Sequence, residues 1–182
     1  MVRVSCLFMA ASALALAACK PAPEATSATA PAAPQAPSLW SIETQSGAPA
    51  KTVLICADRA VHESFGQSLP EANGQPCQLV GRMPVQKDEL FAARCRIGPD
   101  LFTVHSVAAG DKDSDFTVDT VMETDTREAR RFEYRLRFKK LAESCPEGWA
   151  VGDSASPGDT RLVNSLSGAV RELLMPVQAP AP

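Results

Sequence analysis

The segment 132–141 (FEYRLRFKKL) constrains the fold more than any other stretch of this chain. Phe132, Tyr134, Leu136 and Phe138 alternate with charged residues, which gives an extended strand one apolar and one charged face. Alternation of this kind is typical of antiparallel sheets that bury one face and leave the other in water. The segment therefore predicts a mainly β protein built around a half-solvated sheet.

Further apolar or alternating segments, separated by polar turns, extend this prediction along the chain. The expected strands are 39–45, 52–56, 78–85, 89–96, 102–109, 116–124 and 132–141. Turn signals lie at Asn73-Gly74, at 86–88 and in GDKDSD at 110–115. A short helix capped by Asp58 is expected after the second strand. The whole indicates an antiparallel meander, in a sandwich or half-barrel arrangement.

The end of the chain carries a different pattern. Leu162, Leu166 and Val170 follow Asp159 at helical spacing, with Leu173 and Leu174 beyond them. We expect an amphipathic helix over 160–175 that packs on the sheet or on its open edge. A sheet curved around an apolar cavity, with this helix as a lid, would favour lipid carriage.

The first 19 residues (MVRVSCLFMAASALALAAC) have the layout of a secretory signal peptide. Arg3 precedes an apolar stretch that is shorter than the about 20 residues needed to cross a bilayer. Its end, Leu16-Ala17-Ala18-Cys19, resembles the bacterial lipobox, which implies cleavage before Cys19 and lipidation of its sulfur. The alternative is an ordinary signal peptide in which Cys19 has no role. Cys6 is expected to leave with the peptide.

The lipobox implies four segments and a location. Residues 1–18 form the signal peptide, and 19–38 form the lipidated cysteine with an Ala/Pro-rich linker. The folded domain is expected over 39–175, with a disordered tail at 176–182. Lys20 follows the lipidated position in place of an inner-membrane retention Asp, so we expect a periplasm-facing anchor, more in the outer than in the inner membrane.

Four cysteines remain in the expected domain. An even number in an oxidising compartment is typical of two disulfides. Cys77 and Cys95 are equidistant from a turn at residue 86, which favours their pairing across a hairpin and leaves Cys56 to pair with Cys145. The alternative, a thiol metal or redox site, lacks a CxxC motif and any zinc-module spacing.

Together these features resemble the bacterial domain-of-unknown-function family numbered 3617. The resemblance rests on LWSIET near the start, TVLICADRA, two cysteines around a hairpin, and RLRFKKLAESCPEGW at the end. It covers residues 39–153 or so. It implies a disulfide-bonded β domain of the envelope, and it implies no activity.

Two charged clusters suggest ligands. Asp111, Asp113 and Asp115 alternate like the start of an EF-hand loop, but Phe116 replaces the required Gly, so a polar hairpin turn is the better interpretation. A run of cations that includes Arg130 and Arg131 suggests a patch for anionic lipid or a polyanion. The alternative is pairing with acids of strand 116–124, with Arg135 opposite Glu123 and Lys139 opposite Asp119.

Catalytic motifs are scarce. His62 and His105 are isolated in sequence, and Ser64 lies in no nucleophile elbow. The net charge of −3, from 18 basic and 21 acidic residues, gives no reason to expect nucleic-acid binding. We expect a non-catalytic envelope lipoprotein without cofactor or metal that binds an envelope protein, a lipid or peptidoglycan. The alternative is a small periplasmic hydrolase or metal-dependent enzyme, favoured by a pocket that holds His62 or His105 beside an acid.

Overall fold

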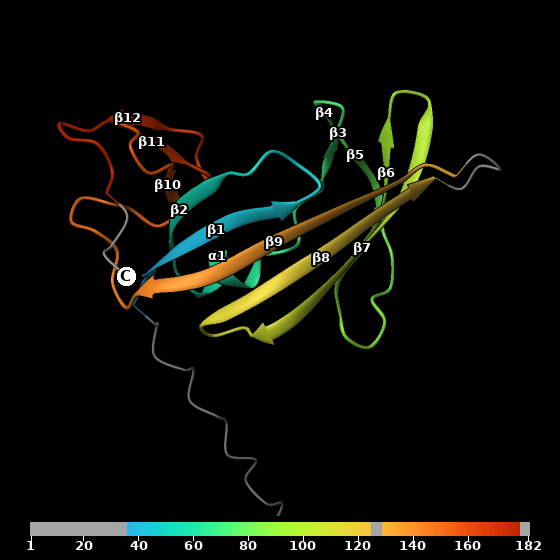
Figure 1. Ribbon diagram of the computed structural model, residues 1–182, viewed down its shortest axis with the longest axis horizontal. Helices are drawn as coiled ribbons and strands as arrows, with labels where there is room; N and C mark the ends of the chain where they lie inside the picture. Colours follow the sequence, from blue (N-terminus) through green and yellow to red (C-terminus); the bar gives the residue numbers. More distant parts are fainter. Residues whose placement is uncertain (1–35, 125–128, 179–182) are drawn as a thin grey trace, which may run out of the picture. The chain divides into compact units, whose positions relative to one another are not determined.

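The computed structural model describes residues 36–124 and 129–178, and this part of the chain is mainly β. Its main feature is one antiparallel sheet in the order β12-β11-β10-β2-β1-β9-β8-β7-β6-β5 (Figure 1). The strands are β1 (Ser38–Ser46), β2 (Thr52–Ala57), β5 (Gln78–Arg82), β6 (Glu89–Ile97), β7 (Asp100–Asp111), β8 (Asp115–Thr124), β9 (Arg131–Ala142), β10 (Asp153–Ala155), β11 (Arg161–Asn164) and β12 (Val170–Glu172). A separate pair, β3 (Glu71–Ala72) and β4 (Gln75–Pro76), flanks Asn73-Gly74. The expected antiparallel sheet is confirmed.

The topology is two meanders joined through the first hairpin. Strands β5 to β9 follow one another across the sheet, and so do β10 to β12. The β1–β2 hairpin lies between them, with β1 hydrogen-bonded to β9 and β2 to β10. Since β5 and β12 stay at opposite edges, the sheet is open and does not close into a barrel.

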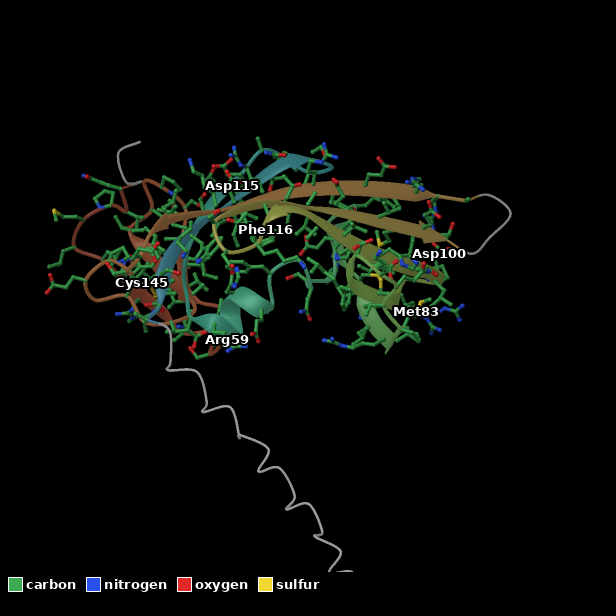
Figure 2. All side chains as sticks on the ribbon, turned by 90° about the horizontal axis from the view of Figure 1, so that it is seen from below. Arg59, Met83, Asp100, Asp115, Phe116 and Cys145 are labelled. Carbon is green, nitrogen blue, oxygen red and sulfur yellow. A yellow bond between two sulfur atoms is a disulfide. The ribbon has the colours of Figure 1, made fainter. Side chains whose placement is uncertain are left out.

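One short helix follows the second strand, as expected. Helix α1 (Arg59–Glu63) begins after Asp58, whose carboxylate Oδ1 accepts a 2.9 Å hydrogen bond from the Val61 N–H. In Figure 2 the helix, marked by Arg59, lies beneath the strands on one face of the sheet. We call this the inner face.

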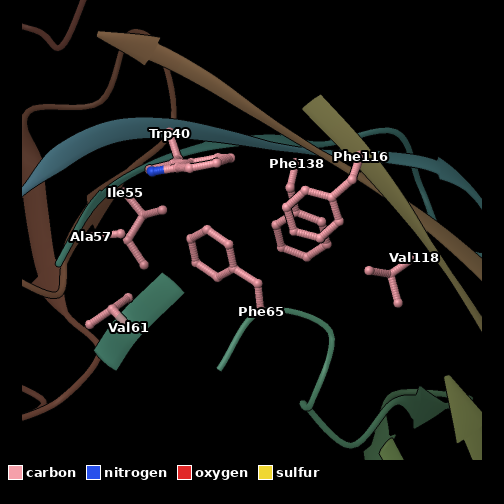
Figure 3. Packing of buried hydrophobic residues seen from close by; sticks show 8 residues of the cluster. All are labelled: Trp40, Ile55, Ala57, Val61, Phe65, Phe116, Val118 and Phe138. Carbon is pink, nitrogen blue, oxygen red and sulfur yellow. The ribbon is translucent and has the colours of Figure 1, made fainter. Parts of the chain in front are cut away.

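Two adjoining apolar clusters fill the inner face. The first joins the sheet to α1 and the segment after it (Figure 3), and it contains Trp40, Ile55, Ala57, Val61, Phe65, Phe116, Val118 and Phe138. The second lies toward β5 and contains Ala72, Cys77, Phe91, Ala93, Cys95, Phe102, Val104 and Met122. The members that come from strands of the main sheet occupy alternate positions, which is why the sequence showed a period of two there.

The opposite, outer face is charged over β8 and β9. The register places Arg135 opposite Asp119 and Lys139 opposite Asp115. The expected pairing of charges is therefore present, but the expected partners are wrong by four residues. A shift by an even number of residues keeps every side chain on its face, so alternation alone does not distinguish the two registers.

The expected C-terminal helix is wrong. The segment forms the β11–β12 hairpin, with Val163 opposite Val170. Asn164 Oδ1 accepts hydrogen bonds from the N–H groups of Leu166 and Ser167, and Gly168 has a φ of 71°. These features stabilise a tight turn, and they override the helical spacing of the leucines. The described residues contain no helix long and apolar enough to cross a membrane.

A third apolar cluster covers the outer face at this end of the sheet. It contains Leu39, Leu54, Ala155, Leu162 and Val177. Val177 is buried, and its N–H donates to the Asp159 carbonyl oxygen at 2.8 Å. The folded unit therefore continues past residue 175 at least to Val177, although a tail was expected from 176. Residues 179–182 lie outside the described part.

Both expected disulfides are present. Cys77–Cys95 has a Cα–Cα distance of 5.4 Å, and Cys56–Cys145 has one of 5.5 Å. In the β5–β6 register Cys95 lies opposite Leu79, so Cys77 reaches it diagonally from just before β5 rather than from the facing position. The second disulfide connects β2 to the segment that follows β9.

Candidate functional site

The lipidation residue Cys19 lies outside the described residues, and so does Arg127, the first cation of the run that contains Arg130 and Arg131. The other residues singled out from the sequence are distributed over different parts of the sheet.

The acidic cluster forms the β7–β8 turn. There Asp111 accepts from the Asp113 N–H at 3.0 Å and from the Ser114 hydroxyl at 2.6 Å, and the Ser114 bond in particular holds its pKa below the usual value. Asp115 is bound at 2.6 Å by Arg137, which lowers the pKa of that carboxyl. No group of three or more potential metal ligands occurs among the described residues.

The two arginines of the suggested anionic-ligand patch are engaged in ion pairs. Arg130 binds Asp100, and its guanidinium carbon lies 5.5 Å from the Phe102 ring centroid. Arg131 binds Glu123 and also Glu133, the latter at 2.6 Å. Exposed pairs of this kind contribute little to stability, but they reduce the local positive potential. The geometry therefore favours the pairing interpretation.

His105 contacts an acid beside the turn between β5 and β6. Its Nδ1 lies 2.9 Å from Glu89 Oε1. Glu89 Oε2 also accepts a 2.7 Å hydrogen bond from the Gln86 N–H, and this backbone bond is the main cause that lowers its pKa. Neither His105 nor Glu89 lines the hollow that holds His62 or the apolar hollow beside α1. The pair closes the β5–β6 turn against β7.

His62 lies in an open hollow of about 580 Å³ whose lining includes Asp58, Asp113 and Glu143. Its ring stacks on Trp40 at a centroid distance of 4.7 Å, and its Nε2 lies 2.8 Å from the Lys112 carbonyl oxygen. Asp58 is engaged as the helix cap, and Glu143 pairs with Lys140 at 3.4 Å. Among the described hydrogen bonds, none joins His62 to a carboxylate. His62 therefore connects α1 to the β7–β8 turn.

A second hollow lies between the inner face and α1. It has a volume of about 440 Å³, within the range of small-molecule sites. Its lining is Ile42, Ile55, Val61, Ser64, Phe65, Gly66, Ser68, Thr120, Leu136, Phe138, Ser165 and Leu166, and none of these residues is charged. We call it the inner hollow.

The buried residues that line the inner hollow are apolar. Ile55, Val61, Phe65 and Phe138 have exposed fractions of 7%, 5%, 7% and 2%. Phe65 stacks on Phe138 with ring centroids 4.9 Å apart (Figure 3). Aromatic and β-branched side chains at these places form a rigid apolar surface.

The mouth of the inner hollow is lined by exposed residues. Leu166, on the β11–β12 turn, is 68% exposed and lies against Gly152, where an added Cβ would clash with its side chain. Ser64 and Ser165 donate their hydroxyl protons to the carbonyl oxygens of Val61 and Gly152, at 2.6 and 3.0 Å. Leu166 thus lines the hollow from a turn, although the sequence predicted that it belongs to a helix.

Sequence reasoning missed this site. Its lining comes from β1, β2, α1 with the segment that follows it, β8, β9 and the β11–β12 turn, which are brought together only by the tertiary structure. One available signal was the apolar face of 132–141, which supplies Leu136 and Phe138. Comparison with protein-family models, with curated proteins and with solved structures finds no match to this chain.

Proposed function

We propose that this chain is a lipid-anchored protein of the bacterial envelope, facing the periplasm, and that its sheet domain is a non-catalytic binding module. The lipobox at Leu16–Cys19 and the Ala/Pro-rich linker support the anchor. The two disulfides fit an oxidising compartment. The resemblance to the family numbered 3617 agrees with this proposal and remains a prediction.

The observation that carries the binding role is the inner hollow. It is concave, apolar at its deep end and free of charged lining among the described residues. Its uncovered apolar surface comes from the half-buried Ile42 and Leu136 and the exposed Leu166, and uncovered apolar surface in a hollow is typical of a binding site. A small apolar molecule can displace water from this surface without leaving a buried charge unpaired. Among the expected partner classes, the hollow favours lipid over protein or peptidoglycan.

The enzyme alternative has less support. It rests on the His62 hollow, where the histidine is held by Trp40 and by the Lys112 carbonyl oxygen and does not bind an acid. A general base needs a group that orients it and a free nitrogen aimed at a substrate. His62 does not line the inner hollow, so His62→Gln should leave ligand binding by that hollow intact.

Binding is tested with the neutral apolar fluorophore N-phenyl-1-naphthylamine and the Cys19→Ala chain, which carries no lipid of its own. We expect saturable fluorescence enhancement. Ser68→Trp, which places an indole at the mouth, should weaken binding at least tenfold. Ser144→Trp, at an exposed serine outside the hollow, should leave it unchanged. Equal binding by both variants would remove the support for this site.

The anchor is tested separately by labelling cells with radioactive palmitate. The native chain should incorporate label, whereas Cys19→Ala, which lacks the sulfur that carries the lipid, should not. Cys6→Ala should behave like the native chain, because residue 6 precedes the cleavage site. Recovery of unlabelled native chain with a free amino terminus would contradict the anchor.

A further inference from the structure

We propose that the inner hollow takes one hydrocarbon chain that ends in an uncharged hydrogen-bond donor, such as the hydroxyl of a monoglyceride or the N–H of a fatty amide. This inference rests on the proposed function and specifies its ligand class. It follows from three properties of the hollow: its charge, the state of its hydroxyl groups and the position of its polar atoms.

Because the described lining residues carry no charge, an ionised ligand gains no favourable electrostatic interaction with them. None of the residues lining the hollow in the described part is acidic or basic. A carboxylate or phosphate that enters such a site loses hydration and meets no cation. A neutral polar group has a much smaller desolvation penalty, so the site discriminates against ionised head groups.

Two of the three serine hydroxyl groups at the mouth, those of Ser64 and Ser165, accept rather than donate. Ser64 and Ser165 have committed their protons to the carbonyl oxygens of Val61 and Gly152, which leaves their oxygen lone pairs for a ligand. Thr120 is already joined to the buried hydroxyl of Ser106 at 2.8 Å. A ligand O–H or N–H matches these acceptors, whereas a carboxylate offers only acceptor atoms.

The polar and apolar parts of the hollow are separated along its depth. Ser64, Ser68 and Ser165 are exposed and lie at the mouth, whereas Ile55, Val61 and Phe138 are buried. A ligand with a hydrocarbon chain at one end and a small polar group at the other fits this gradient. The chain enters first, and the donor group stays at the mouth.

The test measures displacement of N-phenyl-1-naphthylamine from the Cys19→Ala chain by monoglycerides with acyl chains of increasing length. Each buried CH₂ contributes about 0.8 kcal/mol, so affinity should rise about fourfold per methylene and level off once the hollow is filled. The fatty acid of the same length, ionised at pH 8, should bind at least tenfold more weakly. Its methyl ester, which lacks a donor, should lie between the two.

Two exposed leucines supply matched variants. Leu166→Asp places a charge at the mouth and should weaken monoglyceride binding at least tenfold, and Leu174→Asp, outside the hollow, should have no effect. If the ionised fatty acid binds as tightly as the monoglyceride, or if affinity ignores chain length, the ligand class is overturned while the binding role stands. If the fluorophore does not bind the native sequence at all, both proposals are overturned.

Discussion

The ring of Phe65 stacks on the ring of Phe138 with centroids 4.9 Å apart and planes inclined by 24°. Phe65 belongs to the segment after α1, and Phe138 to β9, 73 residues further along the chain. This contact fixes α1 to the inner face and forms one side of the inner hollow. Both the stability of the domain and the shape of its candidate site therefore depend on it.

Replacement of Phe65 by alanine removes this contact and its edge-on packing against Trp40. We expect Phe65→Ala to lower the free energy of unfolding by about 3–5 kcal/mol, as for other buried aromatic residues. Urea denaturation followed by tryptophan fluorescence measures the change. Leu174→Ala, at a fully exposed leucine, serves as the control and should change stability by less than about 0.5 kcal/mol. A loss below about 1 kcal/mol at Phe65 would mean that α1 is not held by this stack.

The two disulfides should differ in their contributions because they close loops of different length. Cys56–Cys145 spans 89 residues and Cys77–Cys95 spans 18. Loop-closure entropy gives about 4.6 kcal/mol for the first and about 3.2 kcal/mol for the second. We expect the double variant Cys56→Ala/Cys145→Ala to be the less stable of the two pairwise alanine variants in chemical denaturation. The reverse order would indicate that packing around the buried Cys95, rather than loop length, dominates.

Asp153 should make stability depend on acid. This carboxyl is only 2% exposed, and burial opposes its charge, but hydrogen bonds from Asn164 and the Ala150 N–H together with the charge of Arg171 hold its pKa below the usual value. A lowered pKa stabilises the fold above the unfolded-state pKa of about 3.9, and this stabilisation is lost as the pH falls through the folded value. At pH 7, Asp153→Asn should therefore have a lower free energy of unfolding than the native protein, by about 1–3 kcal/mol, and a lower melting temperature.

The stability difference between the native protein and Asp153→Asn should depend on pH. Thermal melts between pH 7 and pH 2.5 should show the two melting temperatures approaching each other below about pH 4, because protonated Asp153 resembles the amide. Asp115, whose pKa is lowered by Arg137, remains in both proteins and contributes to the shared acid sensitivity. A gap that stays constant over this range would show that the charge of Asp153 has no role.

Gly47 should tolerate replacement by alanine less well than Gly158, another turn glycine with a positive φ. Its φ is 85°, and an added Cβ would overlap the carbonyl oxygen of Glu133 in β9. Gly158 has a similar φ of 88°, but an added Cβ there meets no atom within 4 Å. Both alanine variants incur the backbone penalty of about 1–2 kcal/mol. We expect Gly47→Ala to lose at least about 2 kcal/mol more than Gly158→Ala, and equal losses in urea denaturation would contradict the close approach.

A helix or strand was predictable where a single short-range pattern in the sequence favoured it and no tertiary contact favoured another structure. The alternation in 132–141 identified β9, and Asp58 identified the start of α1. The cysteine pairing was also predictable, since a hairpin around residue 86 brings Cys77 near Cys95 in either of two adjacent registers. In these cases the physical cause lies within a few residues or in one hairpin.

The failures share a different cause. The leucines of 160–175 fit a helix by spacing, but Leu162 packs in the outer cluster while Leu166 lies at the mouth of the inner hollow on a glycine-containing turn. Pairing of β11 with β10 and β12 satisfies the backbone hydrogen bonds that a helix would have satisfied internally. The partners of Asp119 and Asp115 were wrong because alternation fixes the face of a side chain and leaves its partner open.

The sequence alone determined which residues are apolar at a period of two and which cysteines can form disulfides. It also predicted an anchored envelope protein. Only the tertiary structure decided that six separate segments meet around an uncharged hollow, and that His62 and Arg130 are held by neighbours from other elements. The physical reason is one of range. Propensities, caps and alternation act over a few residues, whereas the inner hollow depends on the order and register of strands far apart in the chain.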